Sequence, residues 1–173
     1  VDENITENDI FSYTVPSEEI IKKNKTKAYF FGYFENWNVM KNYKYIKDKM
    51  EFFTHPDGRT PGTFTNFDSL DDHIDHVYYH MQFIKYGFGR ASRDGSRHLQ
   101  NGNINKNEFL ENIIKYDHEI NTKDIDYFCE YIGISTIEFT EILDKHRNEE
   151  IWRKTSNGWD LNFKMNKKII NEN

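Results

Sequence analysis

The sequence is poor in cysteine, since Cys129 is the only one among 173 residues. A single thiol excludes an internal disulfide and a zinc site built on several cysteines of this chain. Long apolar runs are missing as well: no stretch reaches the roughly 18 residues that suggest a membrane span, and no signal-peptide pattern occurs. These absences predict a cytoplasmic protein without membrane insertion.

Positive charge is also in short supply. The chain has 23 lysines and arginines against 29 acidic residues, which gives a net charge of -6 and a pI near 5.6. Non-specific nucleic-acid binders normally carry an excess of basic residues, so we expect no nucleic-acid partner. Hydrophobic residues make up only 36% of the chain, and the 16% of aromatic residues must therefore supply much of the core.

The length fits one domain with flanking segments. Residues 1–27 form a polar leading segment that starts abruptly, which suggests a truncated boundary. We place the domain at residues 28–165 and a polar tail, rich in asparagine and lysine, at residues 166–173. The chain is therefore expected to be a fragment of a larger protein.

Local patterns predict mostly helices. The aromatic stretch AYFFGYF at 28–34 is short and bounded by charge, which indicates a buried strand. Apolar residues at helical spacing predict a helix over 37–53, followed by a surface loop rich in proline and glycine. Further helices are predicted from their cap residues, at Ser69, Asn105, Asn121 or Thr122, and Ser135.

The last predicted element is a hairpin. Asn157-Gly158 between alternating strands is typical of a type I′ turn, and the alternation places Trp152, Trp159, Leu161 and Phe163 on one face. The fold class is thus mainly α, a helical domain of about five or six helices with one N-terminal strand and a C-terminal β-hairpin. The strand would add to the sheet of a larger α/β enzyme.

Three histidines on the helix predicted from Ser69 raise the question of a metal site. His73, His76 and His80 lie on about one stripe of that helix, and imidazoles so spaced can converge on one ion. The stripe borders the apolar face, so we interpret the three as structural histidines and predict no metal ligand.

Residues 124–147 have the outline of a helix-turn-helix. Its second helix presents Glu138, Glu141 and Asp144, whose charge would repel DNA, so an ordinary helical hairpin is the better interpretation. Cys129 lies within the first of these helices, with no cationic neighbour close in sequence, and is interpreted as a buried, inert thiol.

The stretch KYGFGRASRDGSRH at 85–98 concentrates positive charge in this acidic chain. Its glycines allow a close approach of the backbone to a ligand, and the planar arginine forks suit carboxylate and phosphate oxygens. A helix over residues 91–101 would place the three arginines on a single face. We predict a site for pyrophosphate or an acidic sugar, with a solvated loop as the alternative. The candidate contacts are Lys85, Arg90, Arg93 and Arg97; catalytic residues stay unassigned.

The same stretch carries a resemblance to a known family. KYGFGRAS, followed by an N-G-x-I-x-x-x-E helix that ends in Lys115-Tyr116-Asp117, resembles the C-terminal half of N-acetyl sugar amidotransferases of the WbpG and PseA kind. The resemblance spans about residues 28–165. These enzymes act in lipopolysaccharide and flagellin-glycan biosynthesis, the latter of the nonulosonic or pseudaminic acid type.

The resemblance implies a reaction of the ATP-pyrophosphatase superfamily. ATP would adenylate an oxygen of an acidic or nucleotide-linked N-acetyl sugar, and ammonia from a partner glutaminase subunit would displace AMP. An acetamido group thereby becomes an acetamidino group. ATP and magnesium would serve the full-length parent, and the basic stretch would meet the pyrophosphate or hold the sugar.

The family's phosphate loop, Ser-Gly-Gly-x-Asp-Ser, and its paired-cysteine metal motifs are absent from this sequence. Both belong to the N-terminal half of such enzymes. We therefore expect this chain alone to hold no cofactor and to be inactive. A non-catalytic helical interaction domain is the main alternative, and a helix-turn-helix DNA-binding protein is a weaker one.

Overall fold

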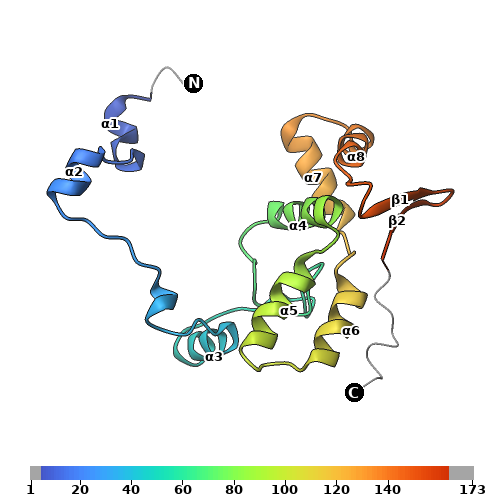
Figure 1. Cartoon of the computed structure of the whole chain (residues 1–173), viewed down its shortest axis with the longest axis horizontal. Coiled ribbons are helices and arrows are strands. Elements are labelled where there is room, and N and C mark those ends of the chain that lie inside the picture. The colour runs from blue at the N-terminus through green and yellow to red at the C-terminus, as the bar shows by residue number, and fades with distance from the viewer. Residues whose placement is uncertain (1–4, 164–173) are drawn as a thin grey trace. The chain divides into compact units, whose positions relative to one another are not determined.

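A computed structural model describes residues 5–163, and the predicted polar tail at 166–173 lies outside these described residues (Figure 1). The chain divides into two units, Val1–Trp37 and Asn38–Asn173. The domain boundaries placed at residues 28 and 165 stay a prediction. No helix among residues 5–163 has the length and apolar character needed to cross a bilayer.

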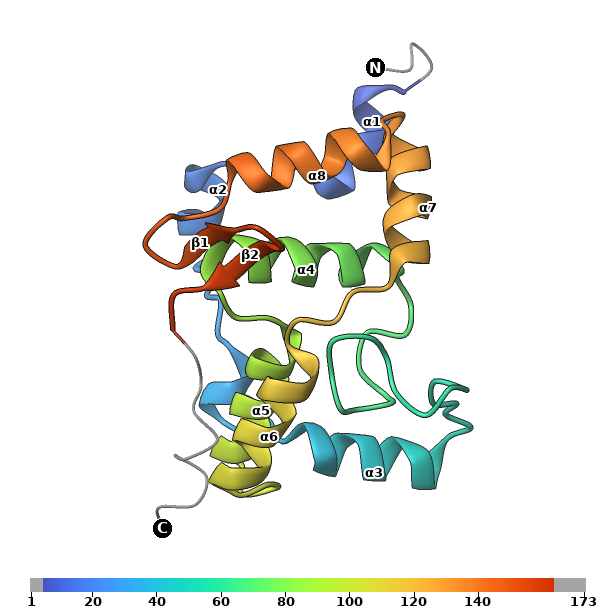
Figure 2. The ribbon, with the colours of Figure 1, turned by 90° about the vertical axis from the view of Figure 1, so that its right-hand side faces the viewer.

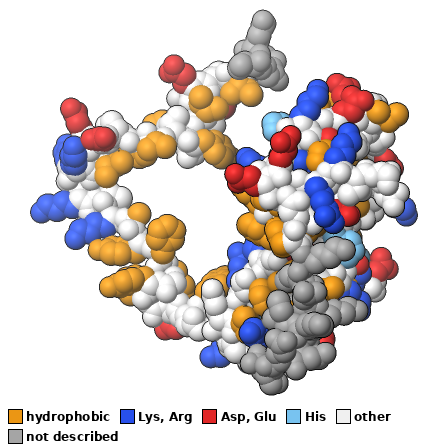
Figure 3. Space-filling model, turned by 45° about the vertical axis from the view of Figure 1, so that its right-hand side comes forward, with side chains coloured by type: hydrophobic (Ala, Val, Ile, Leu, Met, Phe, Trp, Pro, Cys, Tyr) orange, Lys and Arg blue, Asp and Glu red, His pale blue; other side chains and the backbone are white. Residues whose placement is uncertain are grey.

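The first unit contains only short helices: α1 (Glu7–Ile10), η1 (Phe11–Tyr13), α2 (Glu18–Lys23) and η2 (Phe31–Tyr33). The strand predicted at 28–34 is wrong, because η2 occupies this segment and Phe30 is 91% exposed. A strand needs a partner for its backbone groups, and the only sheet within residues 5–163 lies elsewhere. Figure 3 shows hydrophobic side chains uncovered along this unit.

The second unit is mainly helical, as predicted. Its helices are α3 (Val39–Lys49), α4 (Ile74–Tyr86), α5 (Arg90–Gln100), α6 (Lys106–Tyr116), α7 (Thr122–Ile132) and α8 (Thr136–Lys145). Strands β1 (Trp152–Thr155) and β2 (Gly158–Leu161) form an antiparallel hairpin. Helix α4 lies between the α7–α8 pair and the α5–α6 pair, and the hairpin lies beside α4 (Figure 2).

Side-chain caps set most of the helix starts. Asn105 and Glu108 form the predicted capping box of α6, and the Ser135 hydroxyl accepts a hydrogen bond from the Glu138 N–H at 3.1 Å. Helix α4 differs from the prediction, because it begins at Ile74 and not after Ser69. Ser69 has a φ of 49°, which is not helical, and the Asp72 carboxylate caps the Ile74 N–H instead.

The core of the second unit joins α4 to the α7–α8 pair. Val77 and Ile84 of α4 pack with Cys129, Phe139 and Leu143. The helix-turn-helix segment is therefore a packed helical hairpin. Burial raises the pKa of the Cys129 thiol, which agrees with the inert role predicted for it.

The C-terminal hairpin forms, but its turn differs from the predicted one. Thr155 pairs with Gly158, so Ser156 and Asn157 are the loop residues and not Asn157-Gly158. Gly158 alone in this turn has a positive φ, of 119°, whereas a type I′ turn needs two such residues. Trp152 pairs with Leu161, which keeps Trp159 on their face as predicted.

Trp152 anchors the hairpin to α4, because its ring is buried and its Nε1–H donates to the Ile84 carbonyl at 2.7 Å. Trp152→Ala should lower the free energy of unfolding by about 3 to 5 kcal/mol. Arg153→Ala, at an exposed position next to it, should change it by about 0.5 kcal/mol or less. Urea unfolding of both variants checks this difference, and equal midpoints would contradict the observed anchoring.

The histidines at the start of α4 differ in burial. The His73 side chain is 77% exposed and that of His76 only 9%, while His80 is half-buried with an unpaired Nδ1. Burial, together with the nearby Arg147 charge, lowers the pKa of His80 to about 4. The protonated form of His80 is thus disfavoured in the folded state.

Acid should therefore destabilise the fold through His80. Because its pKa is about 6.5 when unfolded and about 4 when folded, its contribution is complete above pH 6.5 and is lost as the pH falls toward 4. The loss approaches about 3 kcal/mol. His80→Gln should flatten the decline in melting temperature between pH 7 and pH 4.5, whereas His146→Gln, at an exposed position, should leave it unchanged. Parallel pH profiles for wild type and His80→Gln would refute this assignment.

Candidate functional site

The basic stretch 85–98 joins two helices through a turn of special backbone geometry. Gly87 ends α4 in the left-handed conformation, with a φ of 75°, and its N–H donates to the Phe83 carbonyl at 2.8 Å. A Cβ at Gly87 would lie 2.7 Å from an Ile151 methyl carbon. The turn at Gly87 therefore packs closely against Ile151, just before the hairpin, and α5 begins a few residues later.

The Asp117 carboxylate caps the first turn of α5 from the end of α6. One oxygen accepts from the Gly89 N–H at 2.8 Å and from the Ser92 hydroxyl at 2.6 Å, and the other accepts from the Ser92 N–H at 2.8 Å. These N–H groups have no partner within the helix, and the negative charge suits its N-terminus. A Cβ at Gly89 would lie 2.4 Å from the Asp117 carbonyl oxygen, so this contact requires glycine.

Arg90 is buried directly behind this turn, with 1% of its surface exposed. Its guanidinium donates to the carbonyls of Pro61 and Asp68 at 3.3 and 2.6 Å, and its Nε lies 3.5 Å from the Asp94 carboxylate. Asp94 also accepts a hydrogen bond from the Thr63 hydroxyl at 2.8 Å. Arg90 and Asp94 thus hold the loop before α4 against α5. This loop is partly buried, whereas the sequence predicted a surface loop.

The four predicted contact residues face different surroundings. The Arg90 guanidinium donates its hydrogen bonds to carbonyl groups inside the fold. Arg93 forms an ion pair with Asp94 at 3.0 Å and donates to the Tyr79 hydroxyl. Lys85 and Arg97 are exposed, and the Lys85 ammonium lies 5.2 Å from the centre of the Tyr86 ring. Anion binding by these four residues stays a prediction. Lys85 and Arg97 are the best candidates, because their side chains are exposed.

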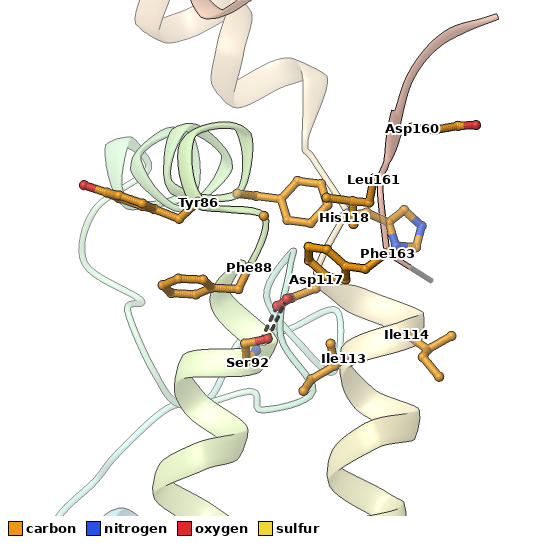
Figure 4. Close-up of a pocket in the computed structure, with 12 residues that line it drawn as sticks. Tyr86, Phe88, Ser92, Ile113, Ile114, Asp117, His118, Asp160, Leu161 and Phe163 are labelled. Carbon is orange, nitrogen blue, oxygen red and sulfur yellow. Dashed lines mark hydrogen bonds between the residues drawn. The ribbon is translucent and has the colours of Figure 1, made fainter. Parts of the chain in front are cut away.

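A cavity of about 550 Å³ opens beside the Asp117 cap. Tyr86 and Phe88 line it from the α4–α5 turn, Ile113 from α6, and Phe163 from the end of the hairpin (Figure 4). The Tyr86 and Phe88 rings are stacked, with centres 5.9 Å apart. The lining is mainly apolar, and its polar members are Ser92, Asp117, His118 and Asp160. Such a cavity suits a partly apolar ligand with a few polar groups.

Comparison with family models matches residues 61–166 to the family described as LPS biosynthesis protein WbpG-like, C-terminal domain. The chain belongs to this family. The match covers the Asp117 cap, the buried Arg90 and the whole cavity lining, so the WbpG-like domain is the part of the chain that carries the site. It confirms the resemblance inferred from the sequence and indicates a role in lipopolysaccharide biosynthesis. A comparison with curated proteins finds no match.

Sequence reasoning did not foresee the cavity, whose walls come from three separate segments. It did single out Lys115-Tyr116-Asp117 as part of the family motif, but without a role for Asp117. The signal available was the pair of motifs KYGFGRAS, which spans the junction of α4 and α5, and KYD, at the end of α6. The structure brings these two motifs into contact.

The two arginines of α5 offer a matched test of burial. Arg90→Ala should lower the free energy of unfolding by about 3 to 5 kcal/mol, because it leaves Asp94 and two carbonyls without their buried donor. Arg97→Ala, at an exposed position of the same helix, should cost about 0.5 kcal/mol or less. Thermal unfolding measured for both variants distinguishes the roles. Similar melting temperatures would show that Arg90 does not brace the loop.

Proposed function

We propose that this WbpG-like domain is the substrate-side part of an ATP-dependent N-acetyl sugar amidotransferase in bacterial surface-polysaccharide or flagellin-glycan biosynthesis. The family match to a lipopolysaccharide biosynthesis protein supports the pathway class. The observation that carries the proposal is the aromatic cavity built directly on the family motif. The proposed reaction exchanges the acetamido oxygen for an imino nitrogen from ammonia, while ATP is cleaved to AMP, which takes up the oxygen, and pyrophosphate.

The cavity does not suit ATP. Its described lining includes Asp117 and Asp160 but no lysine or arginine, and carboxylates repel phosphate groups, so only the uncharged sugar ring of a nucleotide-linked sugar, and not a triphosphate, suits the interior. The Asp117 oxygens, moreover, already accept the hydrogen bonds of the α5 start. Nucleotide chemistry in the proposed enzyme therefore belongs outside this cavity.

An N-acetyl sugar fits the same lining better. The stacked Tyr86 and Phe88 rings offer a flat apolar surface for the C–H face of a sugar ring and for the acetamido methyl group. His118 and Asp160 can exchange hydrogen bonds with hydroxyl groups. Lys85, whose ammonium lies over the Tyr86 ring, is placed to meet an acidic or phosphate group of the sugar.

The apolar character of the lining also favours a second candidate function, a non-catalytic helical interaction domain. Tyr86 is 50% exposed and Phe88 46%, and aromatic side chains of this kind are frequent at the centres of protein interfaces. In that case the cavity would receive a side chain of another protein segment and no sugar.

The full-length protein should convert a nucleotide-linked N-acetyl sugar, with ATP and ammonia, to a product in which NH replaces one oxygen, as read by mass spectrometry. Phe88→Ala should raise the KM for the sugar by about tenfold, or roughly 1.4 kcal/mol of lost binding, with kcat nearly unchanged. Tyr78→Ala is the control, because Tyr78 is an exposed aromatic of α4 that does not line the cavity.

Lys85→Gln should raise the same KM in a salt-dependent manner, since it removes a charge at an exposed site. The sugar proposal fails if no acetamidino product forms, or if Phe88→Ala leaves the KM unchanged. Loss of a protein partner by Phe88→Ala, with full amidotransferase activity retained, would instead support the interaction domain.

A further inference from the structure

Outside the cavity, three metal-ligating side chains meet at the junction of α4 and α7. The His73 Nδ1 lies 3.2 Å from one oxygen of the Asp124 carboxylate, and the His76 Nδ1 lies 2.6 Å from the other. The ligand atoms of all three residues lie within 4.8 Å of one another. Two imidazole nitrogens thus converge on a single carboxylate.

The fold holds this arrangement in place. His73 is the cap residue of α4 and has helical φ and ψ values of -69° and -25°, so His73 and His76 share one face of the helix. Asp124 belongs to the first turn of α7. The two helices are locked together by the buried Val77 and Cys129. The donor atoms are therefore positioned by a packed core and not by flexible loops.

The exposure of the three side chains suits an ion that is held firmly and remains accessible. The His76 and Asp124 side chains are only 9% and 8% exposed, whereas that of His73 is 77% exposed. An ion between them would have two ligands on the protein side and one on the solvent side. This leaves a coordination position open toward solvent, as in zinc sites with three protein ligands.

The spacing of the ligand atoms fits tetrahedral zinc after a small adjustment. Zinc bonds of about 2.0 Å in tetrahedral geometry place neighbouring ligand atoms about 3.3 Å apart. The 3.2 Å between the His73 Nδ1 and one Asp124 oxygen matches this value, and the 2.6 Å between the His76 Nδ1 and the other Asp124 oxygen is about 0.7 Å shorter, so the carboxylate must turn to offer one oxygen to the ion. Rotation of the Asp124 carboxylate can take up this change, and the exposed His73 ring can follow it.

Simple hydrogen bonding is the competing explanation, because one carboxylate can accept from two histidines without any metal. It accounts for the His76–Asp124 contact, in which the two atoms lie 2.6 Å apart. Water could satisfy the nitrogens of the exposed His73 ring, so the position of this ring beside the same carboxylate depends on more than hydrogen bonding, including its contacts with the His76 and Tyr127 rings. A cation would attract both lone pairs and the carboxylate at once.

We infer that His73, His76 and Asp124 bind a divalent transition-metal ion, zinc above all, at the surface junction of α4 and α7. Two imidazoles and one carboxylate suit zinc, and nickel and copper follow from the same ligand set in vitro. The ion clamps the start of α4 to the start of α7. The proposal revises the expectation that the α4 histidines bind no metal, and it leaves His80, one turn further on, outside the site.

Zinc titration of the purified, metal-free full chain tests the inference. Isothermal titration calorimetry should give one site with a micromolar or lower Kd, and saturating zinc should raise the melting temperature through preferential binding to the folded state. Cobalt should bind the same site and produce the visible absorption bands of a low-coordinate, nitrogen- and oxygen-ligated ion.

His73→Ala is the decisive variant, because this exposed side chain can be removed without disturbing the core. It should weaken zinc binding at least tenfold and abolish the cobalt bands, while the metal-free melting temperature stays within about a degree or two of wild type. Asp124→Asn should also weaken binding, and His146→Ala, which removes an exposed histidine elsewhere, should not. The inference is overturned if wild type binds no zinc at one equivalent, or if His73→Ala binds it like wild type.

Discussion

The carboxylate of Asp117 connects the parts of the WbpG-like domain. Its three hydrogen bonds, each 2.6 to 2.8 Å long, fix the first turn of α5 to the last residue of the α6 region. Helix α5 then presents Arg90 and Asp94 to the loop before α4, and that loop in turn reaches Glu119 through the paired guanidinium of Arg59. Losing the Asp117 charge would therefore weaken the link between α5 and α6 on which this chain of contacts builds.

The candidate ligand cavity and the histidine cluster lie on different parts of this framework. The cavity depends on the α4–α5 turn, the end of α6 and the hairpin, whereas the cluster depends on the packing of α4 against α7. Helix α4 is the element that both share. Ligand binding at one site and ion binding at the other can thus be studied separately, although a shift of α4 along its axis would be felt at both.

Local signals predicted the helices well and the tertiary contacts poorly. Caps such as Asn105 and Ser135 act on neighbouring backbone groups, and the alternation of the hairpin kept Trp152 and Trp159 on one face even though the turn differs. The segment 28–34 has strand composition but no strand partner among residues 5–163, and composition cannot supply one. The positive charge at 85–98 suggested a ligand, whereas the partners of Arg90 are Pro61, Asp68 and Asp94, of which two lie far away in the sequence.

The close contact between Gly89 and Asp117 has a consequence for how members of this family diverge. Any side chain at position 89 would collide with the backbone carbonyl of residue 117. Loss of the carboxylate at 117 would leave the N–H groups of residues 89 and 92 without their hydrogen-bond acceptor. The clash at 89 involves the backbone carbonyl of residue 117, which no substitution at 117 removes, so each position is constrained by itself and selection for folding alone is enough to retain both. The motif that identifies the domain should consequently persist even in descendants that have lost their substrate, and its presence in a genome marks common ancestry more securely than it marks a working enzyme.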